Sequence, residues 1–194
     1  MFKLVIFDLD GTITQPHLDF QKIKKQVGAA PGEPMTLLEY MGTLSPERRE
    51  RAVRILEQHE DEAAKKSQLR DGVAEFIESL RRSGAKVAIL TRNSRRSADT
   101  VLRKHSISVD FVVTRDEPPP KPSPEAVLRI CRALGVCPEE SLVVGDFRYD
   151  VLAGQAAGAK TALLSDSDED VDVVPDFVIT GIPELKRIIN GHKD

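Results

Sequence analysis

The hydrophobic positions of this 194-residue chain gather into six short runs that have the length of β-strands. Most of the runs lack polar alternation, which is typical of strands that are buried on both faces of a sheet. The pattern therefore predicts a parallel sheet. The six runs are Leu4 to Phe7, Val87 to Leu90, Phe111 to Val113, Leu142 to Val144, Thr161 to Leu164 and Phe177 to Ile179.

Between several of these runs, apolar residues return at helical spacing. The spacing i, i+3, i+4, i+7 holds for Val73 to Leu80 and for Ala98 to His105, so each stretch predicts a helix with one apolar stripe. A third helix is expected from Ser123, as its N-cap, to Gly135, and a fourth over about 183–190. Strands and helices in alternation predict an α/β fold, with a Rossmann-like, doubly wound parallel sheet.

The stretch from about Thr14 to Arg70 interrupts this alternation, because it contains no convincing strand. Its apolar residues keep helical spacing, which indicates an insertion after the first strand. We therefore expect a core domain formed by residues 1–13 and 71–194, and a small helical domain inserted over 14–70. The helices expected in the insertion cover about 18–27, 34–41 and 46–66.

The charges of the chain narrow the class of partner. Its 28 basic and 31 acidic residues are mixed along the chain and leave a net charge of −3, so nothing favours binding to nucleic acid or to a membrane surface. No stretch approaches the roughly 20 apolar residues that span a bilayer. We expect a small molecule as the partner, and a monomer, since no apolar heptad repeat demands a second chain.

The two cysteines, Cys131 and Cys137, match no metal-binding or redox spacing, so we expect both to be reduced. The first residues enter a strand without the features of a leader peptide, which favours the cytoplasm as the location. Asp166, Asp168 and Asp170 alternate as in a calcium loop. The Gly and Glu that such a loop needs are absent at its sixth and twelfth positions, so we interpret this acidic segment as a solvated connection.

Asp8 and Asp10 follow the first strand run directly, and Gly11 comes next. Side chains alternate along an extended chain, so the two carboxylates point the same way if the strand continues to Asp10. Gly11 permits a sharp backbone turn beyond them. An ordinary acidic turn has the same residues, but two neighbouring carboxylates also offer a nucleophile and a proton donor.

Further polar groups lie just beyond other expected strands, at the edge where open parallel sheets bind ligands. Thr91 follows the second run, Lys121 lies among prolines after the third, and Asp146 follows the fourth. Asp150 comes four residues after Asp146, and the two share a face if the segment is helical. Taken singly, these residues also suit plain structural roles: a helix-start turn, a surface lysine and an N-cap.

Taken together and in order, the motifs resemble those of the haloacid dehalogenase (HAD) superfamily of hydrolases, in particular its phosphoglycolate phosphatase-like branch. The resemblance implies that the insertion over 14–70 is a small helical cap domain. The resemblance implies that Asp8 attacks phosphorus and forms an aspartyl-phosphate. It implies that Asp10 protonates the leaving alcohol and then accepts a proton from the hydrolytic water. The matching motifs are Asp8-Leu9-Asp10-Gly11-Thr12, Thr91, Lys121 and Gly145-Asp146 with Asp150.

The resemblance also implies a cofactor and a set of binding residues. Carboxylates beside a phosphate dianion require a cation, and oxygen ligands favour Mg²⁺. Thr91 and Lys121 are implied to bind the phosphoryl oxygens, and Asp150 to orient Lys121 or metal-bound water. The implied Mg²⁺ ligands are Asp8, Asp10 through its backbone carbonyl, and Asp146.

We therefore expect a Mg²⁺-dependent phosphatase, a hydrolase of phosphomonoesters, that acts on a small phosphorylated metabolite. Asp10 supports an oxygen leaving group, because a halide needs no proton. Two alternatives stay open: a phosphomutase, and a non-catalytic phosphate-binding regulatory module, which only the bulky Phe147-Arg148-Tyr149 favours. His17, Asp19 and Phe20, close after the catalytic turn, are candidate specificity residues, with a hinge or packing role as the alternative.

Overall fold

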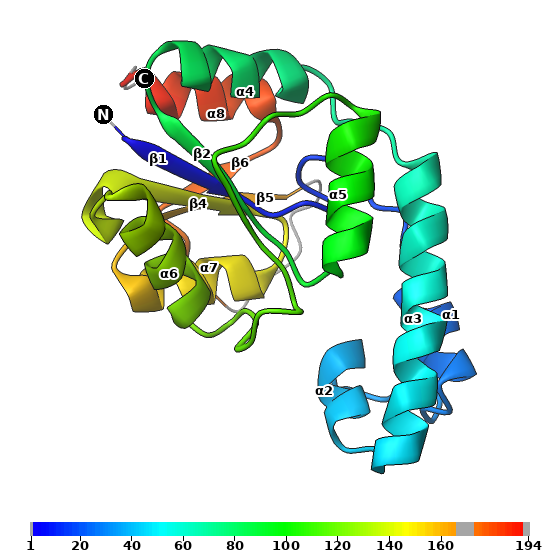
Figure 1. Ribbon diagram of the computed structural model, residues 1–194. Coiled ribbons are helices and arrows are strands. Elements are labelled where there is room, and N and C mark those ends of the chain that lie inside the picture. The colour runs from blue at the N-terminus through cyan, green and yellow to red at the C-terminus, as the bar shows by residue number, and fades with distance from the viewer. Residues whose placement is uncertain (1, 166–172, 192–194) are drawn as a thin grey trace.

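The computed structural model describes residues 2–165 and 173–191, in which the six expected strands all form (Figure 1). Every neighbouring pair is parallel, and the order across the sheet is β3-β2-β1-β4-β5-β6. The acidic segment 166–172 lies outside the described residues. The strands are β1 (Leu4–Phe7), β2 (Lys86–Leu90), β3 (Phe111–Val113), β4 (Ser141–Gly145), β5 (Lys160–Leu164) and β6 (Phe177–Ile179).

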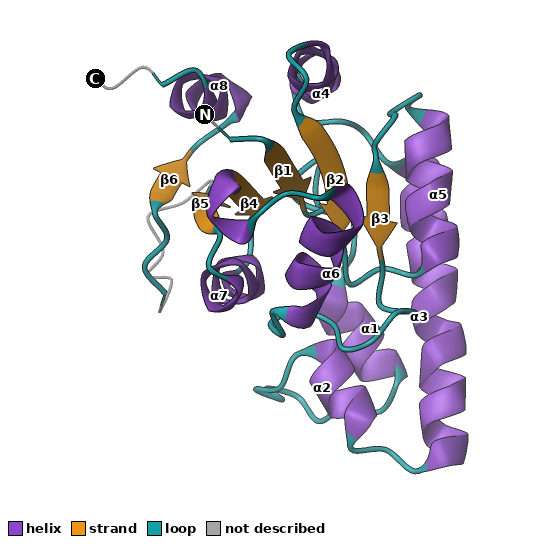
Figure 2. Ribbon diagram, turned by 60° about the vertical axis from the view of Figure 1, so that its left-hand side comes forward, coloured by secondary structure: helices purple, strands orange, loops and turns teal. Residues whose placement is uncertain are grey.

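Helices cover both faces of the sheet, which confirms the doubly wound α/β fold (Figure 2). Strand β1 shows why its residues are all apolar, because Val5 and Phe7 pack on one face and Leu4 and Ile6 on the other. On the first face the rings of Phe7 and Phe76 meet edge to face, with centroids 6.4 Å apart. The first face is covered by α4 (Val73–Arg82), α5 (Arg95–Lys104) and α8 (Ile182–Ile189), and the second by α6 (Glu125–Leu134) and α7 (Arg148–Ala157).

The helix ends follow the expected capping residues in part. Gly135 ends α6 in the left-handed conformation, as expected. Ser123 as the N-cap of α6 was wrong, because Pro124 takes that position and the Ser123 hydroxyl accepts a hydrogen bond from the backbone N of Glu125 at 3.3 Å. A 3-10 helix, η1 (Pro138–Glu140), precedes β4. No helix among the described residues is long and apolar enough to cross a membrane.

The segment between β1 and α4 forms three helices with an apolar cluster of their own, and α3 runs alongside α5 (Figures 1 and 2). The first two helices begin later than expected because Asp19 and Thr36 act as their N-caps. Both ends of the segment leave the core side by side, since the backbone N of Gln15 donates to the Gln68 carbonyl at 2.9 Å. The helices are α1 (Phe20–Gln26), α2 (Leu37–Gly42) and α3 (Pro46–Lys66).

Candidate active site

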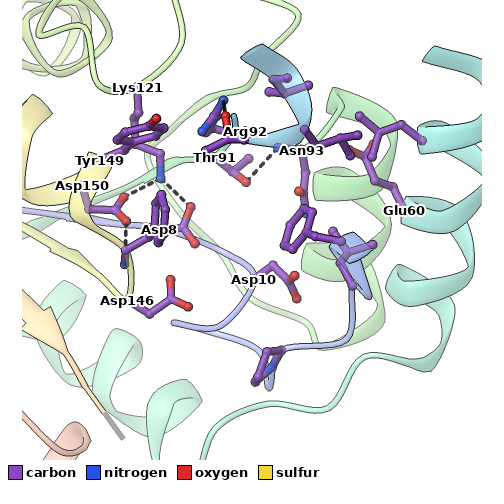
Figure 3. A pocket seen from close by; sticks show the side chains of 18 of the residues that line it. Asp8, Asp10, Glu60, Thr91, Arg92, Asn93, Lys121, Asp146, Tyr149 and Asp150 are labelled. Carbon is purple, nitrogen blue, oxygen red and sulfur yellow. Dashed lines mark hydrogen bonds and ion pairs between the residues drawn. The ribbon is translucent and has the colours of Figure 1, made fainter. Parts of the chain in front are cut away.

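The expected site residues meet at the carboxyl ends of the central strands. The strand order reverses between β1 and β4, and ligands of open α/β sheets bind in the crevice at such a point. Asp8 follows β1, Thr91 follows β2 and Asp146 follows β4, while Lys121 comes from the loop after β3. These four side chains line one cavity of about 420 Å³ (Figure 3).

Lys121 is buried between two carboxylates. Its Nζ donates to Asp8 Oδ1 at 2.6 Å and to Asp150 Oδ1 at 2.5 Å. Burial alone would lower the pKa of Lys121, but the charges of Asp150 and Asp8 raise it, so the ammonium stays protonated. Asp150 Oδ2 also accepts a hydrogen bond from the backbone N of Phe147 at 3.3 Å. Lys121 is therefore a fixed positive charge whose position depends on Asp150.

Asp150 and Asp146 do not share a helix face. Helix α7 begins at Arg148, so Asp150 stands in its first turn and Asp146 lies in the preceding turn. Gly145 allows this arrangement, because a Cβ on residue 145 would lie only 2.0 Å from the Asp150 Cγ. Strand β4 thus ends beneath the carboxylate that holds Lys121.

Asp10 lies in the same cavity, away from Lys121 (Figure 3). Burial and the charge of Asp8 raise the pKa of Asp10 to about 6, against the lowering effect of hydrogen bonds such as that from Thr14 Oγ1, at 3.4 Å. A carboxyl with such a pKa exchanges a proton near neutral pH. Asp10 therefore suits a proton donor and acceptor.

Asp146 lies close against the turn that follows β1. The Thr12 hydroxyl donates to Asp146 Oδ1 at 3.3 Å, and a Cβ on residue 11 would lie 2.0 Å from Asp146 Oδ2. Gly11 has a φ of +90°, which also favours glycine. Burial, followed by the charges of Asp8 and Asp150, raises the pKa of Asp146 to about 7. The crevice thus concentrates negative charge that Lys121 alone does not balance.

The residues fit a small hard cation. Within 2–165 and 173–191, no three His, Cys, Asp or Glu side chains form a ready-made metal site. The expected Mg²⁺ set needs only the carboxylates of Asp8 and Asp146 and the backbone carbonyl of Asp10. Such a set suits Mg²⁺, which keeps several waters and usually takes one or two carboxylates plus substrate phosphate. Burial, followed by the charges of Asp8 and Asp150, raises the pKa of Asp146, and a cation between the carboxylates would offset both effects.

Thr91 is buried, and its hydroxyl oxygen accepts a hydrogen bond from the backbone N of Asn93 at 3.1 Å. Because a hydroxyl has one proton and two lone pairs, its O–H stays available as a donor. Ser94, which follows Asn93, is the N-cap of α5. Thr91 can therefore donate to an anion in the cavity.

The three helices α1–α3 provide much of the remaining cavity lining. Of the three candidate specificity residues, Phe20 lines the cavity and is half exposed. Asp19 instead caps α1 by accepting a hydrogen bond from the backbone N of Lys22, at 2.9 Å, and His17 is exposed and not part of the lining. The apolar lining residues from residues 14–70 are Pro16, Leu18, Phe20, Leu37, Leu38 and Leu56.

Arg92 and Tyr149 also line the cavity, and sequence reasoning missed both roles. The Arg92 guanidinium lies over the Tyr149 ring, 4.8 Å from its centroid. The Tyr149 hydroxyl donates to Glu39 Oε1 at 2.5 Å, so α7 of the core contacts α2. Their positions in the sequence could have indicated these roles, because Arg92 directly follows Thr91 and Tyr149 directly precedes Asp150.

The two cysteines take no part in the site. Cys131 is buried within α6, where its Sγ lies 3.6 Å from Ser141 Oγ, and Cys137 is exposed beside η1. Neither forms a disulfide.

Known proteins resemble the chain over most of its length. Pyrophosphatase PpaX of Halalkalibacterium halodurans is 30% identical over 95% of this chain and 95% of its own length. Phosphoglycolate phosphatase of Aquifex aeolicus is 27% identical over 98% of each. A crystal structure of a hydrolase from Pseudomonas syringae shares the fold, with a TM-score of 0.84 and 20% identity over 99% of this chain and 100% of that one.

A family model agrees with these likenesses and with the crevice. Residues 2–158 match the model described as haloacid dehalogenase-like hydrolase, and this range includes Asp8, Thr91, Lys121, Asp146 and Asp150. The chain therefore belongs to the haloacid dehalogenase-like hydrolases.

Proposed function

We propose that the protein is a Mg²⁺-dependent phosphatase that hydrolyses a small phosphomonoester through an aspartyl-phosphate on Asp8. The observation that carries this proposal is the contact between Lys121 Nζ and Asp8 Oδ1, at 2.6 Å inside the cavity. One oxygen of Asp8 is held, and the carboxylate has a second with which to attack phosphorus. The names of two relatives, a phosphoglycolate phosphatase and a pyrophosphatase, support phosphoryl chemistry.

In the first step, an Asp8 oxygen forms a bond to phosphorus while the bond from phosphorus to the leaving oxygen breaks. Asp10 gives its proton to that leaving oxygen, for which a pKa of about 6 is suited. Lys121 and the Thr91 hydroxyl bind the phosphoryl oxygens, whose charge must be stabilised in the transition state. The alcohol then leaves, and the phosphoryl group stays on Asp8.

In the second step, water attacks phosphorus and gives its proton to Asp10, and the bond to Asp8 breaks. Asp10 and Asp8 thereby return to their starting states. Mg²⁺, held by Asp8, Asp146 and the Asp10 carbonyl, would supply charge stabilisation to the phosphoryl group. Asp150 acts through Lys121, since it holds the ammonium at 2.5 Å.

We also propose that residues 14–70 act as a cap over the phosphate. Helices α1–α3 line the cavity opposite the strand ends and contact the core at α5 and α7. A cap excludes water from the site and contacts the leaving group. The segment is therefore the place where substrate preference is expected to reside.

The test is phosphate release from small phosphomonoesters, with Mg²⁺ and with EDTA. Wild-type protein should release phosphate only with the metal. Asp8→Asn should lower kcat by at least about 10³-fold, because the nucleophile is lost. Mass spectrometry of rapidly acid-quenched wild-type protein should find a phosphoryl group on the peptide that contains Asp8. Turnover that survives in Asp8→Asn would overturn the proposal.

A further inference from the structure

The part of the cavity that α1–α3 contribute is mostly apolar. Its leucines and Phe20 offer hydrocarbon and aromatic surface, which can pack against a leaving group but cannot bind a charge. Lys24 is also part of the lining, but its Nζ already donates to the Glu33 carbonyl at 2.9 Å. That bond uses one of the three N–H groups of Lys24 and places its ammonium beside a carbonyl, so a second cation of the cavity is the better candidate for recognising a charged leaving group.

Arg92 is a partly buried cation of the same cavity, and its hydrogen-bonding capacity is largely unused. Its Nε is buried and has no hydrogen-bond partner within 2–165 and 173–191. Among the described residues it forms no ion pair, and its one side-chain hydrogen bond is a long contact from Nη2 to Thr36 Oγ1, at 3.5 Å. A buried N–H without an acceptor costs free energy, so such a group in a cavity points to a ligand.

The carboxylates whose charges act most on Arg92 are Glu39, Asp150 and Asp8, and all three accept hydrogen bonds from other donors. Asp8 and Asp150 bind Lys121, at 2.6 and 2.5 Å. Glu39 accepts hydrogen bonds from the Tyr149 hydroxyl and from the backbone N of Thr36, at 2.5 and 2.8 Å. Because a guanidinium stays protonated in proteins, the charge of Arg92 is left for an anion that enters the cavity.

The Tyr149 ring holds the guanidinium in place. The Arg92 Cζ lies 4.8 Å from the ring centroid, a cation–π contact that orients the guanidinium. Arg148 lies 5.9 Å from the centroid of the same ring but is not part of the cavity lining. Figure 3 shows Arg92 beside Thr91 and Tyr149, with Asp8 and Lys121 nearby. The two arginines thus share a stacking partner, and only Arg92 faces the substrate space.

We propose that Arg92 recognises a second anionic group on the substrate, so that the leaving group itself carries a carboxylate or a further phosphate. The inference rests on the proposed hydrolase function and deepens it by naming a substrate class. Arg92 directly follows Thr91, which is proposed to bind the transferred phosphoryl group, so the second anion lies only a few bonds from phosphorus. The guanidinium can bind either anion through two parallel N–H groups.

The test compares three compounds: 2-phosphoglycolate, inorganic pyrophosphate and ethyl phosphate. Ethyl phosphate matches phosphoglycolate in length but has a methyl group in place of the carboxylate. Wild-type kcat/KM should favour phosphoglycolate, pyrophosphate or both over ethyl phosphate by about 10- to 100-fold, the usual range for one charge-assisted contact. Arg92→Met should remove this preference, and Arg92→Lys should restore part of it. The favoured compound identifies the second anion as a carboxylate or a phosphate.

Two controls separate this inference from its alternatives. Arg148→Met also removes a cation from the Tyr149 ring, and it should keep the wild-type preference. Circular dichroism of each variant establishes that it is folded. An equal loss on all three compounds in Arg92→Met would overturn the inference, because Arg92 would then serve the transferred phosphoryl group. Hydrolysis by wild type without any preference would overturn it too, while the proposed phosphatase would stand.

Calorimetric binding to Asp8→Asn gives a readout that needs no turnover. This variant should bind the favoured anionic compound about 10- to 100-fold more tightly than ethyl phosphate, and the difference should vanish in Asp8→Asn/Arg92→Met. If the wild type hydrolyses none of the three compounds, the proposed phosphatase activity is contradicted. The difference in binding between the anionic compound and ethyl phosphate still decides the role of Arg92. Equal binding of all three compounds would overturn the inference.

Discussion

At the scale of single residues, three aspartates of one crevice have different chemistry because their contacts differ. Asp8 is held by Lys121, whose ammonium lies 2.6 Å away. Asp10 forms no ion pair with any residue that the structure describes, and burial, followed by the charge of Asp8, raises its pKa to about 6. Asp146 lies against the turn that follows β1, and burial raises its pKa to about 7. The roles proposed for them, as nucleophile, proton carrier and metal ligand, thus differ through their surroundings and not through residue type.

Replacing Asp146 separates metal binding from folding. Its folded-state pKa is raised, so stability is lost as pH rises toward about 7 and the carboxylate ionises. Above a pH of about 7 and without metal, the midpoint temperature of unfolding of Asp146→Asn should equal or exceed that of the wild type. Mg²⁺ at about 100 times its Kd should stabilise wild type by about 2.7 kcal/mol and the variant by less. Thermal unfolding with Mg²⁺ or EDTA measures both effects, and an equal Mg²⁺ response would contradict this role.

Gly145→Ala tests whether the backbone of β4 sets the position of Lys121. The new Cβ would lie 2.0 Å from the Asp150 Cγ, so Asp150 must move and release its hold on Lys121. We expect a loss of stability of about 1–3 kcal/mol, as for overpacked sites, and a lower kcat. Gly42→Ala is the matched control, because nothing lies within 4 Å of its Cβ. Equal stability and turnover in both variants would exclude this positioning.

At the scale of elements, local patterns predicted the strands well. The run from Leu4 to Phe7 packs on both faces of the sheet, and such a strand has a nearly continuous apolar sequence. Helix starts were less predictable where several capping residues follow one another. Pro124 rather than Ser123 is the N-cap of α6, and α2 begins only after Thr36, three residues later than expected.

The residues of the candidate site also differ in how well the sequence predicts them. Asp8, Thr91 and Asp146 could be predicted because each follows its own strand, and parallel strands bring their carboxyl ends to one edge. The link from Tyr149 to Glu39 joins residues 110 positions apart, on helices whose relative placement no local pattern specifies. The unpartnered Nε of Arg92 is likewise a property of the packed cavity and not of the sequence around it.

Asp176 stabilises the pairing of the outer strands β5 and β6. It accepts hydrogen bonds from the backbone N and the hydroxyl of Thr161, at 2.9 and 3.0 Å, and from Lys160 Nζ at 2.6 Å. Burial alone would raise the pKa of Asp176, but these hydrogen bonds lower it below its ordinary value. The stabilisation is therefore present above the unfolded-state pKa and is lost as pH falls below about 4.

Asp176→Asn should consequently change the acid dependence of stability. The variant keeps an oxygen for Thr161 but loses the charge opposite Lys160, so we expect a loss of about 0.5–1 kcal/mol near neutral pH for this partly exposed pair. The difference from wild type should shrink as the pH falls from about 5 to about 3. Urea denaturation across this range measures it. A difference that is constant with pH would show that the charge of Asp176 contributes nothing.

At the scale of the whole molecule, the inserted segment is held to the core on two sides of the cavity. On one side Glu60 of α3 is buried and pairs with Arg115, and its Oε2 accepts a hydrogen bond from the backbone N of Ser94 at 3.2 Å. On the other side Glu39 of α2 accepts a hydrogen bond from the hydroxyl of Tyr149. Removing one partner of a buried pair is costly, so we interpret Glu60 as the permanent attachment and Glu39 as the contact that can open.

Tyr149→Phe should therefore loosen the cavity without unfolding the protein. The phenyl ring keeps its contact with Arg92, and only the hydrogen bond to Glu39 is lost. We expect a stability change within about 1 kcal/mol, the usual net worth of one hydrogen bond, a several-fold fall in kcat/KM, and faster amide hydrogen exchange in α2. Tyr40→Phe is the matched control, because its hydroxyl donates to the Gly28 carbonyl at 2.7 Å within the inserted segment. The loss of a contact that closes a cap over its substrate should lower turnover. If both variants keep wild-type kcat/KM, the contact between Tyr149 and Glu39 therefore does not govern access to the site.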